Sequence, residues 1–170
     1  MDKVLLVTGA SRGIGAATAR LAAQDGWAVA VNYTANSLAA DEVVRTIRAT
    51  GGNAITVQAD VADEAQVLRM FETLDAKLGR LTGLVNNAGV VDVTARLDEM
   101  SVARWRRMFD INVIGSLLCA REAVRRMSPR HGGTGGAIVN VSSAASRLGS
   151  PGQYLDYAAA KGAIDAFTIG

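Results

Sequence analysis

The sequence of 170 residues has little of several residue types: one cysteine, one histidine and two prolines. The single cysteine, Cys119, excludes a disulfide within the chain and favours a reducing compartment, the cytoplasm. It lies in an apolar helical run, so we interpret it as a core residue rather than a nucleophile. The single histidine, His131, is followed by two glycines, and no set of metal ligands can be assembled around it. We therefore expect neither a disulfide framework nor a bound metal.

Long hydrophobic runs are absent as well. No apolar segment has the length of a transmembrane helix, and the apolar start of the chain stops at a glycine turn, unlike a signal peptide. A dominant charge is also lacking, because 18 basic and 16 acidic residues are mixed along the chain. Arginines do cluster, at Arg104, Arg106, Arg107, Arg121, Arg125, Arg126 and Arg130. The mixed charge favours a solvated helix face, so we expect neither nucleic acid nor a membrane as a partner.

Strand-length apolar runs alternate with longer helical patterns along the whole chain. The expected strands span residues 3–8, 27–33, 53–60, 81–89 and 135–143, and the expected helices span 14–26, 37–52, 63–79, 101–127 and a last segment that starts near Tyr154. Such alternation is typical of a parallel sheet with right-handed crossovers. Hydrophobic residues make up 49% of the chain, enough for one substantial core. We predict a single α/β domain over residues 1–170, a Rossmann-type doubly wound sheet with helices on both faces.

A glycine-rich turn, "TGASRGIG" at residues 8–15, follows the first expected strand and opens the first expected helix. Its glycines are Gly9, Gly13 and Gly15. Without Cβ atoms the backbone can turn tightly and approach phosphate oxygens, while free N–H groups and the helix dipole face the anion. This placement predicts a dinucleotide phosphate site.

The end of the second expected strand indicates which dinucleotide would bind. An NAD site needs an acid there to accept from the ribose 2′-hydroxyl. The sequence instead reads "VNYTANS", with Asn32, Tyr33 and Thr34 and no carboxylate. Arg12, inside the glycine-rich turn, is placed to meet a 2′-phosphate. We predict NADP(H) rather than NAD(H); a solvated loop cation is the alternative interpretation of Arg12.

The stretch "GSPGQYLDYAAAKGAIDAF", residues 149–167, contains two tyrosines and one lysine. Tyr157 and Lys161 are four residues apart, which places them on one helix face, one turn apart. Tyr154 is seven residues from Lys161 and out of direct reach. A positive charge beside a phenol favours the phenolate, which suits proton transfer. Two ordinary helix residues are the alternative interpretation of this pair.

Six motifs together carry a resemblance to the short-chain dehydrogenase/reductase family. They are "TGASRGIG" (8–15), "ADV" (59–61), "NNAG" (86–89), "INVIG" (111–115), "VNVSS" (139–143) and "YAAAK" (157–161). They follow one another in the order of the family and cover the whole chain. The glycine spacing is similar to that of β-ketoacyl carrier-protein reductases and glucose dehydrogenases. The resemblance implies an oxidoreductase that transfers a hydride between a nicotinamide and a small carbonyl or secondary alcohol.

The resemblance also implies catalytic roles. Tyr157 would be the proton donor, and Lys161 would favour its phenolate and hold the nicotinamide ribose. Ser143, rather than the neighbouring Ser142, would bind the reacting oxygen, and Asn112 would kink its helix and hold a water in a proton relay. Tyr154 either lines the substrate mouth or packs in the fold.

Cofactor contacts are implied in the same way. Asp60 would contact the adenine amino group with Val61 beside the ring, and Asn86 would join neighbouring strands. The full cofactor-binding set that we expect is Gly9, Ser11, Arg12, Gly13, Ile14, Gly15, Asn32, Tyr33, Thr34, Asp60, Val61, Asn87, Ala88, Gly89, Tyr157 and Lys161.

Members of the family continue after the catalytic helix with further strands and a substrate lid. We therefore expect this chain to be a fragment whose fifth strand leaves an apolar edge; the alternative is a short nucleotide-binding module without turnover. The resemblance implies a homo-oligomer, a dimer or tetramer, formed through the helices at 101–127 and 154–169. Small residues of the last helix would permit close approach, namely Ala158, Ala159, Ala160, Gly162 and Ala163.

Overall fold

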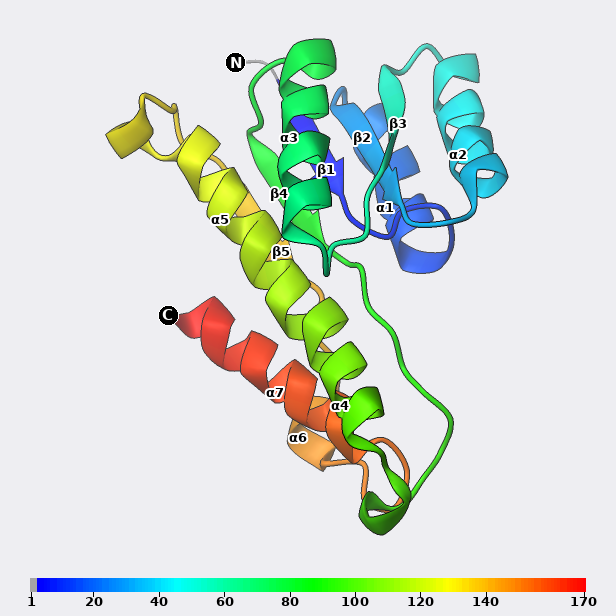
Figure 1. The fold of residues 1–170 in the computed structure, drawn as a ribbon. Coiled ribbons are helices and arrows are strands. Elements are labelled where there is room, and N and C mark those ends of the chain that lie inside the picture. Colours follow the sequence, from blue (N-terminus) through cyan, green and yellow to red (C-terminus); the bar gives the residue numbers. More distant parts are fainter. Residues whose placement is uncertain (1–2) are drawn as a thin grey trace.

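Five parallel strands form one sheet in the computed structural model, which describes residues 3–170 (Figure 1). The strands are β1 (Val4–Val7), β2 (Ala28–Tyr33), β3 (Ala54–Gln58), β4 (Gly83–Asn86) and β5 (Ala137–Asn140), and they lie in the order β3-β2-β1-β4-β5. Winding proceeds from β1 to one side as far as β3 and then resumes on the other side at β4. This confirms the predicted doubly wound sheet.

Helices connect the strands and cover both faces of the sheet. They are α1 (Gly13–Gln24), α2 (Ser37–Ala49), α3 (Glu64–Leu78), α4 (Val102–Phe109), α5 (Gly115–Met127), α6 (Ala145–Leu148) and α7 (Leu155–Ile169), with 3-10 turns at Leu97–Glu99 and Pro129–His131. Polar side chains fix where two of them begin. Asn36 accepts from the N–H of Ala39 at the start of α2, and Asp63 accepts from that of Gln66 at the start of α3.

Each face of the sheet has its own hydrophobic core, because successive strand residues point to opposite faces. Leu6 packs with α3 and α5, which lie side by side in Figure 1, whereas Val7 packs with α1 and α2. Cys119 of α5 is fully buried in the first core, as expected. Burial raises the pKa of its thiol to about 12, and the charge of Glu122 acts in the same direction.

The helical region expected over residues 101–127 is present but is not one continuous α-helix. A π-helical turn, Asp110–Ile114, separates α4 from α5. The side-chain amide of Asn112 donates to the carbonyl oxygen of Met108 at 2.9 Å and is fully buried. A side chain that bonds into the helix backbone in this way widens the local turn, and such π-bulges are frequent at functional sites.

β5 is an edge strand among the described residues, as expected. Val139 on this strand is 54% exposed. Backbone groups on its outer side face no neighbouring strand within residues 3–170, so the edge is open to pairing. None of the helices formed by residues 3–170 is both long and apolar enough to cross a membrane.

Candidate active site

The candidate residues gather at the carboxyl edge of the sheet. The glycine-rich turn follows β1, Asp60 follows β3, Asn87 follows β4 and Ser143 follows β5. The winding of the sheet reverses between β1 and β4, and doubly wound proteins bind ligands outside the carboxyl ends of the strands at such a reversal. Parallel strands therefore bring together motifs that lie far apart in the sequence.

The hydroxyl of Thr8 joins β1 to the turn after β4. It donates to the carbonyl oxygen of Val85 at 3.3 Å and accepts from the N–H groups of Asn87 and Ala88, each at 3.0 Å. One donor and two acceptor sites are the whole capacity of a hydroxyl, so Thr8 is fully used inside the protein. This residue was not among the predicted site residues, although it is the first of the glycine-rich motif.

Close packing explains the glycines of this turn. A Cβ on Gly9, whose φ is +60°, would lie 2.9 Å from the Cα of Ala88. A Cβ on Gly15 would lie 2.5 Å from the side-chain nitrogen of Asn87, which donates to the carbonyl oxygens of Thr8 and Gly9. The turn is thus a backbone cradle held in shape by Asn87, at the start of α1.

Arg12 lies inside this cradle, just before α1. Its side chain is exposed and forms no ion pair with any residue in the range 3–170. Ile14 is exposed beside it. The guanidinium is therefore open to an anion that approaches the start of the helix.

Asn32, at the end of β2, has its side chain bonded within the protein. Its side-chain oxygen accepts from the N–H of Gly9 at 3.0 Å, and its amide donates to the carbonyl oxygens of Val57 and Ala59. The side chain is buried and fixes the glycine-rich turn from within. Thr34 is exposed and Tyr33 is half-buried, so these two remain open to a ligand.

Asp60 and Val61 follow β3, and their side chains contact different parts of the protein. The Asp60 carboxylate accepts from the N–H of Ala62 at 3.0 Å, which shapes the turn. Val61 is buried, and a Cβ on Gly115 would lie 2.7 Å from its Cγ2. The start of α5 therefore lies directly against the residue after Asp60.

Asn112 connects the π-helical turn to the loop after β4. Its side chain accepts from the N–H of Val90 at 3.1 Å and donates to the carbonyl oxygen of Val90 at 3.0 Å. A Cβ on Gly89 would lie 2.7 Å from the Asn112 side-chain oxygen. The amide thus holds residues 89 and 90 beside the glycine-rich turn.

Tyr157 and Lys161 lie on one face of α7, as their spacing predicts. The Lys161 ammonium is 5.6 Å from the centroid of the Tyr157 ring and donates to the carbonyl oxygen of Val141 at 2.6 Å. Burial lowers the pKa of Lys161, and the carboxylate of Asp165 acts in the opposite direction. Tyr157 is half-buried against a small apolar cluster of Met108, Val113 and Ala160.

Ser142 and Ser143 lie beyond β5, because that strand ends at Asn140 rather than at residue 143. Successive residues of a strand point to opposite faces of the sheet, but this rule gives no direction for two residues beyond the end of the strand. The Ser142 hydroxyl donates to the carbonyl oxygen of Lys161 at 3.4 Å, whereas the Ser143 hydroxyl accepts from the N–H of Ala145 at 3.2 Å. Ser142 thus faces α7, and Ser143 begins the turn into α6.

Tyr154 precedes α7 and contacts the loop after β4. Its hydroxyl accepts from that of Thr94 at 3.1 Å, and the carbonyl oxygen of Gln153 accepts from the N–H of Ala95 at 3.1 Å. The tyrosine side chain is half-buried, so it joins two loops rather than packing in a core.

The interpretation of the arginine cluster as a solvated face is wrong for Arg104 and Arg126. The Arg104 side chain is 10% exposed and forms a bidentate ion pair with Asp156, which is 1% exposed. Burial raises the pKa of Asp156, but the hydrogen bonds and charge of Arg104, together with backbone N–H groups of the first turn of α7, outweigh burial and leave that pKa below its usual value. The signal that could have found Asp156 is its place in the first turn of a helix, where an acid is stabilised.

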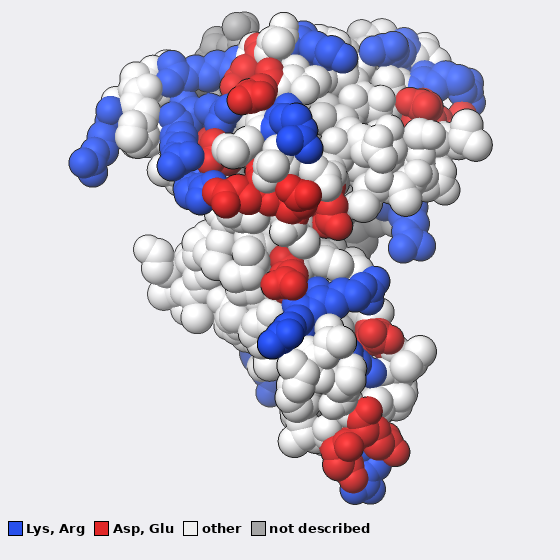
Figure 2. Space-filling view, in the orientation of Figure 1, with Lys and Arg blue, Asp and Glu red and all other residues white. Residues whose placement is uncertain are grey.

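Other arginines of the cluster also pair with acids. Arg126 contacts Asp75 at 2.8 Å, and Arg121 contacts Glu64 at 2.6 Å. On the face drawn in Figure 2, lysine and arginine side chains lie among acidic ones. This mixture differs from the continuous basic stripe of a nucleic-acid surface.

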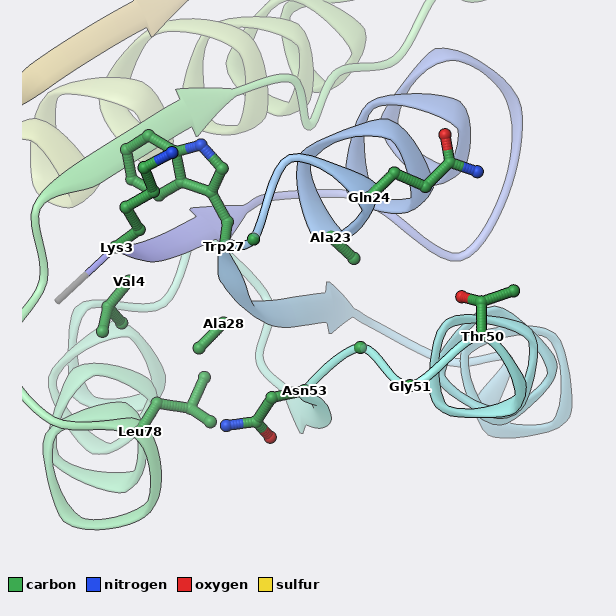
Figure 3. A pocket seen from close by; sticks show the side chains of 12 residues that line it. Lys3, Val4, Ala23, Gln24, Trp27, Ala28, Thr50, Gly51, Asn53 and Leu78 are labelled. Atoms are coloured by element: carbon green, nitrogen blue, oxygen red, sulfur yellow. The ribbon is translucent and has the colours of Figure 1, made fainter.

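A hollow of about 710 Å³ lies at the opposite, amino-terminal edge of the sheet and contains none of the candidate residues (Figure 3). Its walls include Lys3, whose ammonium is 6.0 Å from the ring of Trp27.

Within residues 3–170 no group of histidine, cysteine and acidic side chains is arranged to hold a metal ion.

A doubly wound parallel sheet with a glycine-rich cradle at its point of reversal defines a dinucleotide-binding α/β protein. The sequence profile described as "short chain dehydrogenase" matches residues 3–170. The chain belongs to the short-chain dehydrogenase/reductase family.

Comparison with curated proteins gives relatives along nearly the whole chain. It is 54% identical over 167 residues to the uncharacterized oxidoreductase YgfF of Escherichia coli (strain K12), covering 98% of this chain and 68% of the relative. It is 43% identical over 166 residues to a 3-oxoacyl-(acyl-carrier-protein) reductase of Synechocystis sp., covering 98% and 65%. It is 44% identical over 165 residues to a cis-4-hydroxycyclohexanecarboxylate dehydrogenase of Sinomonas cyclohexanicum, covering 96% and 63%. The chain thus spans about two thirds of the length of these relatives.

Proposed function

We propose that the protein is an NADP-dependent oxidoreductase that interconverts a small carbonyl compound and the corresponding secondary alcohol, with Tyr157 as the acid and base. The observation that carries the proposal is the Tyr157–Lys161 pair, 5.6 Å from ammonium to ring, at the same edge of the sheet as the glycine cradle. Residues 1–170 would form the dinucleotide-binding domain.

The residues present fit a phosphorylated dinucleotide. The glycine cradle leaves backbone close to the start of α1 without Cβ atoms in the way, and Arg12 has no anionic partner among residues 3–170. The end of β2 offers Tyr33 and Thr34 but no carboxylate to repel a 2′-phosphate. These features support NADP(H) over NAD(H).

The remaining predicted contacts surround this cradle. Ser11, Gly13 and Ile14 belong to the same turn, and Ala88 and Gly89 follow β4 beside it. Asn87 and Asn32 would act through the backbone that they hold, since their side chains are bonded within the protein. Asp60 and Val61 would flank the adenine.

When bound, a nicotinamide supplies or accepts the hydride at the substrate carbon. In the reducing direction the Tyr157 hydroxyl gives its proton to the carbonyl oxygen, and in the oxidising direction its phenolate takes the proton of the alcohol. Lys161 places a positive charge beside this phenol, which favours the phenolate. The Ser143 hydroxyl would donate to the same reacting oxygen, and an oriented donor of this kind contributes about 3 kcal/mol to the transition state.

Asn112 would act indirectly. Its side chain is spent on Met108 and Val90, so it fixes the π-helical turn beside Tyr157. The backbone of that turn is where the proposed relay water would bind.

Two relatives have names that suit this reaction. One is named as a reductase of a 3-oxoacyl group and another as a dehydrogenase of a hydroxycyclohexanecarboxylate. Both names describe chemistry between C=O and CH–OH, and we propose the same chemistry for this protein.

Replacing each tyrosine with phenylalanine tests the proposal. In the full-length protein, assayed by NADPH oxidation against a panel of carbonyl compounds and by NADP⁺ reduction against alcohols, Tyr157→Phe should lower kcat by about 10²–10⁴-fold, the usual contribution of a general acid. The binding of NADPH, followed by its fluorescence, should stay close to that of the parent.

Tyr154→Phe is the matched control, because this tyrosine is three residues away on the same segment and contacts Thr94 instead. It should change KM more than kcat. Full activity of Tyr157→Phe, or loss of turnover in Tyr154→Phe alone, would contradict the assignment.

A further inference from the structure

One guanidinium ties three segments of the candidate active site together. Arg104, in α4, donates from Nε to Asp156 Oδ2 at 2.7 Å and from Nη2 to Asp156 Oδ1 at 3.1 Å. Its Nη1 donates to the carbonyl oxygen of Val93 at 2.7 Å. Arg104 thus joins α4 to the first turn of α7 and to the loop after β4.

The planar geometry of arginine is needed for this arrangement. Its donors point in fixed, divergent directions, so it can grip both oxygens of one carboxylate and a separate carbonyl at once. A lysine would keep the charge but would lose the bidentate contact. The Arg104 and Asp156 side chains are 10% and 1% exposed, so water does not substitute for these bonds.

A buried ion pair by itself is poor evidence for added stability, because desolvation offsets much of the attraction. A buried ion pair can instead hold two segments in a fixed relative position. The position of this pair in the fold shows which segments it holds. Asp156 is the residue before Tyr157, and its carboxylate also interacts with the backbone N–H of Tyr157. The carboxylate that Arg104 holds is therefore directly attached to the helical turn that carries the tyrosine.

The loop held by Val93 is attached to the same place by two further contacts. Thr94 donates to the Tyr154 hydroxyl, and the N–H of Ala95 donates to the carbonyl oxygen of Gln153. Hydrogen bonds therefore link residues 93–95 to residues 153–156 and to α4. A second acid near Arg104 is Asp92, which lies 3.8 Å from Arg107, also in α4.

We propose that Arg104 and Asp156 are positioning residues, which set the place of the Tyr157 hydroxyl relative to the substrate by clamping the first turn of α7 to α4 and to the loop at residues 93–95. This inference rests on the proposed function, since it assigns the clamp to the reaction of Tyr157. Neither residue touches the reacting atoms.

Three variants of the full-length protein test the clamp: Asp156→Asn, Arg104→Met and the double variant. Each single variant should lower kcat by about 10- to 100-fold, the scale of a misplaced reacting group, because Tyr157 moves while remaining present. NADPH affinity should change by no more than about twofold, since the clamp contacts no part of the cradle. The double variant should lose no more kcat than the worse single variant, because the two residues act as a unit.

A matched control separates positioning from stability. Arg126 and Asp75 form another ion pair, between α5 and α3 and away from Tyr157, with one contact and side chains 18% and 38% exposed. Asp75→Asn should lower the thermal midpoint and leave kcat unchanged, whereas Asp156→Asn should lower kcat in protein that is fully folded at the assay temperature. Arg104→Lys keeps the charge, gives a variant expected to fold if Arg104→Met does not, and should recover part of the kcat lost in Arg104→Met.

Unchanged kcat in Asp156→Asn or Arg104→Lys would overturn the inference. So would a parallel loss of kcat, NADPH affinity and folded fraction, because that pattern reports structure alone. Tyr157→Phe, measured in the same assay, keeps the two proposals apart. If Tyr157→Phe stays active, the proposed function fails. If Tyr157→Phe is inactive while Asp156→Asn or Arg104→Lys keeps full kcat, only the clamp fails.

Discussion

Thr8 shows how a single side chain can organise the candidate site through hydrogen bonds within the protein. Its hydroxyl bonds to Val85, Asn87 and Ala88, so β1 and the turn after β4 are held in one register. Asn87 completes the link through the carbonyl oxygens of Thr8 and Gly9. Both residues keep the glycine cradle in shape before any cofactor arrives, which lowers the ordering cost of binding.

Arg12 is the residue whose replacement should separate the two nicotinamide cofactors. Arg12→Ala should weaken NADPH binding by about 10- to 100-fold, the value of one charge-assisted contact, and should leave NADH binding within about twofold. The measurement is fluorescence titration of the full-length protein with each cofactor. Arg130→Ala, at another exposed arginine, is the control and should alter neither affinity. Equal weakening of both cofactors by Arg12→Ala would show that Arg12 does not meet the 2′-phosphate.

The local spacing of residues could be read from the sequence, whereas contacts between distant segments could not. The spacing of Tyr157 and Lys161 was sufficient to place both on one helix face, because a helix has a fixed period. The use of Asn32 as an internal brace was not predictable, since it depends on carbonyl groups of β3 that no local pattern identifies. Arg104 was misread for the same reason, because its partner Asp156 is 52 residues away in the sequence.

At the scale of elements, the π-helical turn and the loop after β4 depend on one another. Gly89 lies against Asn112, and Asn112 lies inside the turn through its bond to Met108. The side-chain oxygen of Asn112 cannot swing aside without breaking its bond to the N–H of Val90. The turn therefore requires a glycine at position 89.

Gly89→Ala tests this dependence. The new Cβ would meet the Asn112 oxygen at 2.7 Å, so the variant should be destabilised by about 1–3 kcal/mol, the usual effect of overpacking. Gly162→Ala is the matched control, because its Cβ would meet nothing within 4 Å in the middle of α7. That change should stabilise the protein by about 0.5–1 kcal/mol. Thermal or denaturant unfolding of both variants gives the comparison, and a neutral Gly89→Ala would contradict the close contact.

The strands and most helices were predictable because apolar runs and glycine stops are local signals. Each strand lies inside its expected range, and α3 begins and ends within one residue of residues 63–79. The break between α4 and α5 was not expected from helical period alone, because it arises from the Asn112 amide and its partners on another segment. Because β5 ends at Asn140, Ser142 and Ser143 lie outside the sheet. The alternation of side chains along a strand therefore does not predict which way these two serines point.

At the scale of the whole molecule, an apolar stripe runs along α4, the π-helical turn and α5. It comprises Val102, Phe109, Ile114, Leu117 and Val124, all partly or largely exposed. The small residues of α7 lie on two different faces of the helix. Ala158 and Ala160 are buried within this chain, whereas Ala159 is exposed. The proposed contact between copies would therefore involve the stripe and the outer face of α7.

We predict that the full-length protein is a homo-oligomer, a dimer or tetramer, formed through this stripe by two-fold symmetry. Leu117→Glu, at a position 37% exposed, should reduce the oligomer to a smaller species in light scattering, because it places a charge in the contact. Leu38→Glu, on α2 at a position 81% exposed, should leave the mass unchanged. A monomeric parent protein at micromolar concentration would refute the prediction.

The strand order also determines the sequence in which the strand pairs of the sheet can form during translation. The β1–β2 and β2–β3 pairs join strands that are consecutive in the sequence, so they can form once about the first third of these residues has left the ribosome. The β1–β4 pair can form only after β4 has been synthesised. Thr8 meets its partners Val85 and Ala88 only 77 and 80 residues later. A nascent chain stopped before residue 83 would therefore carry the glycine-rich turn without the contacts that shape it. The capacity to bind a dinucleotide should therefore appear as a step once residues 85–88 have left the ribosome, rather than gradually.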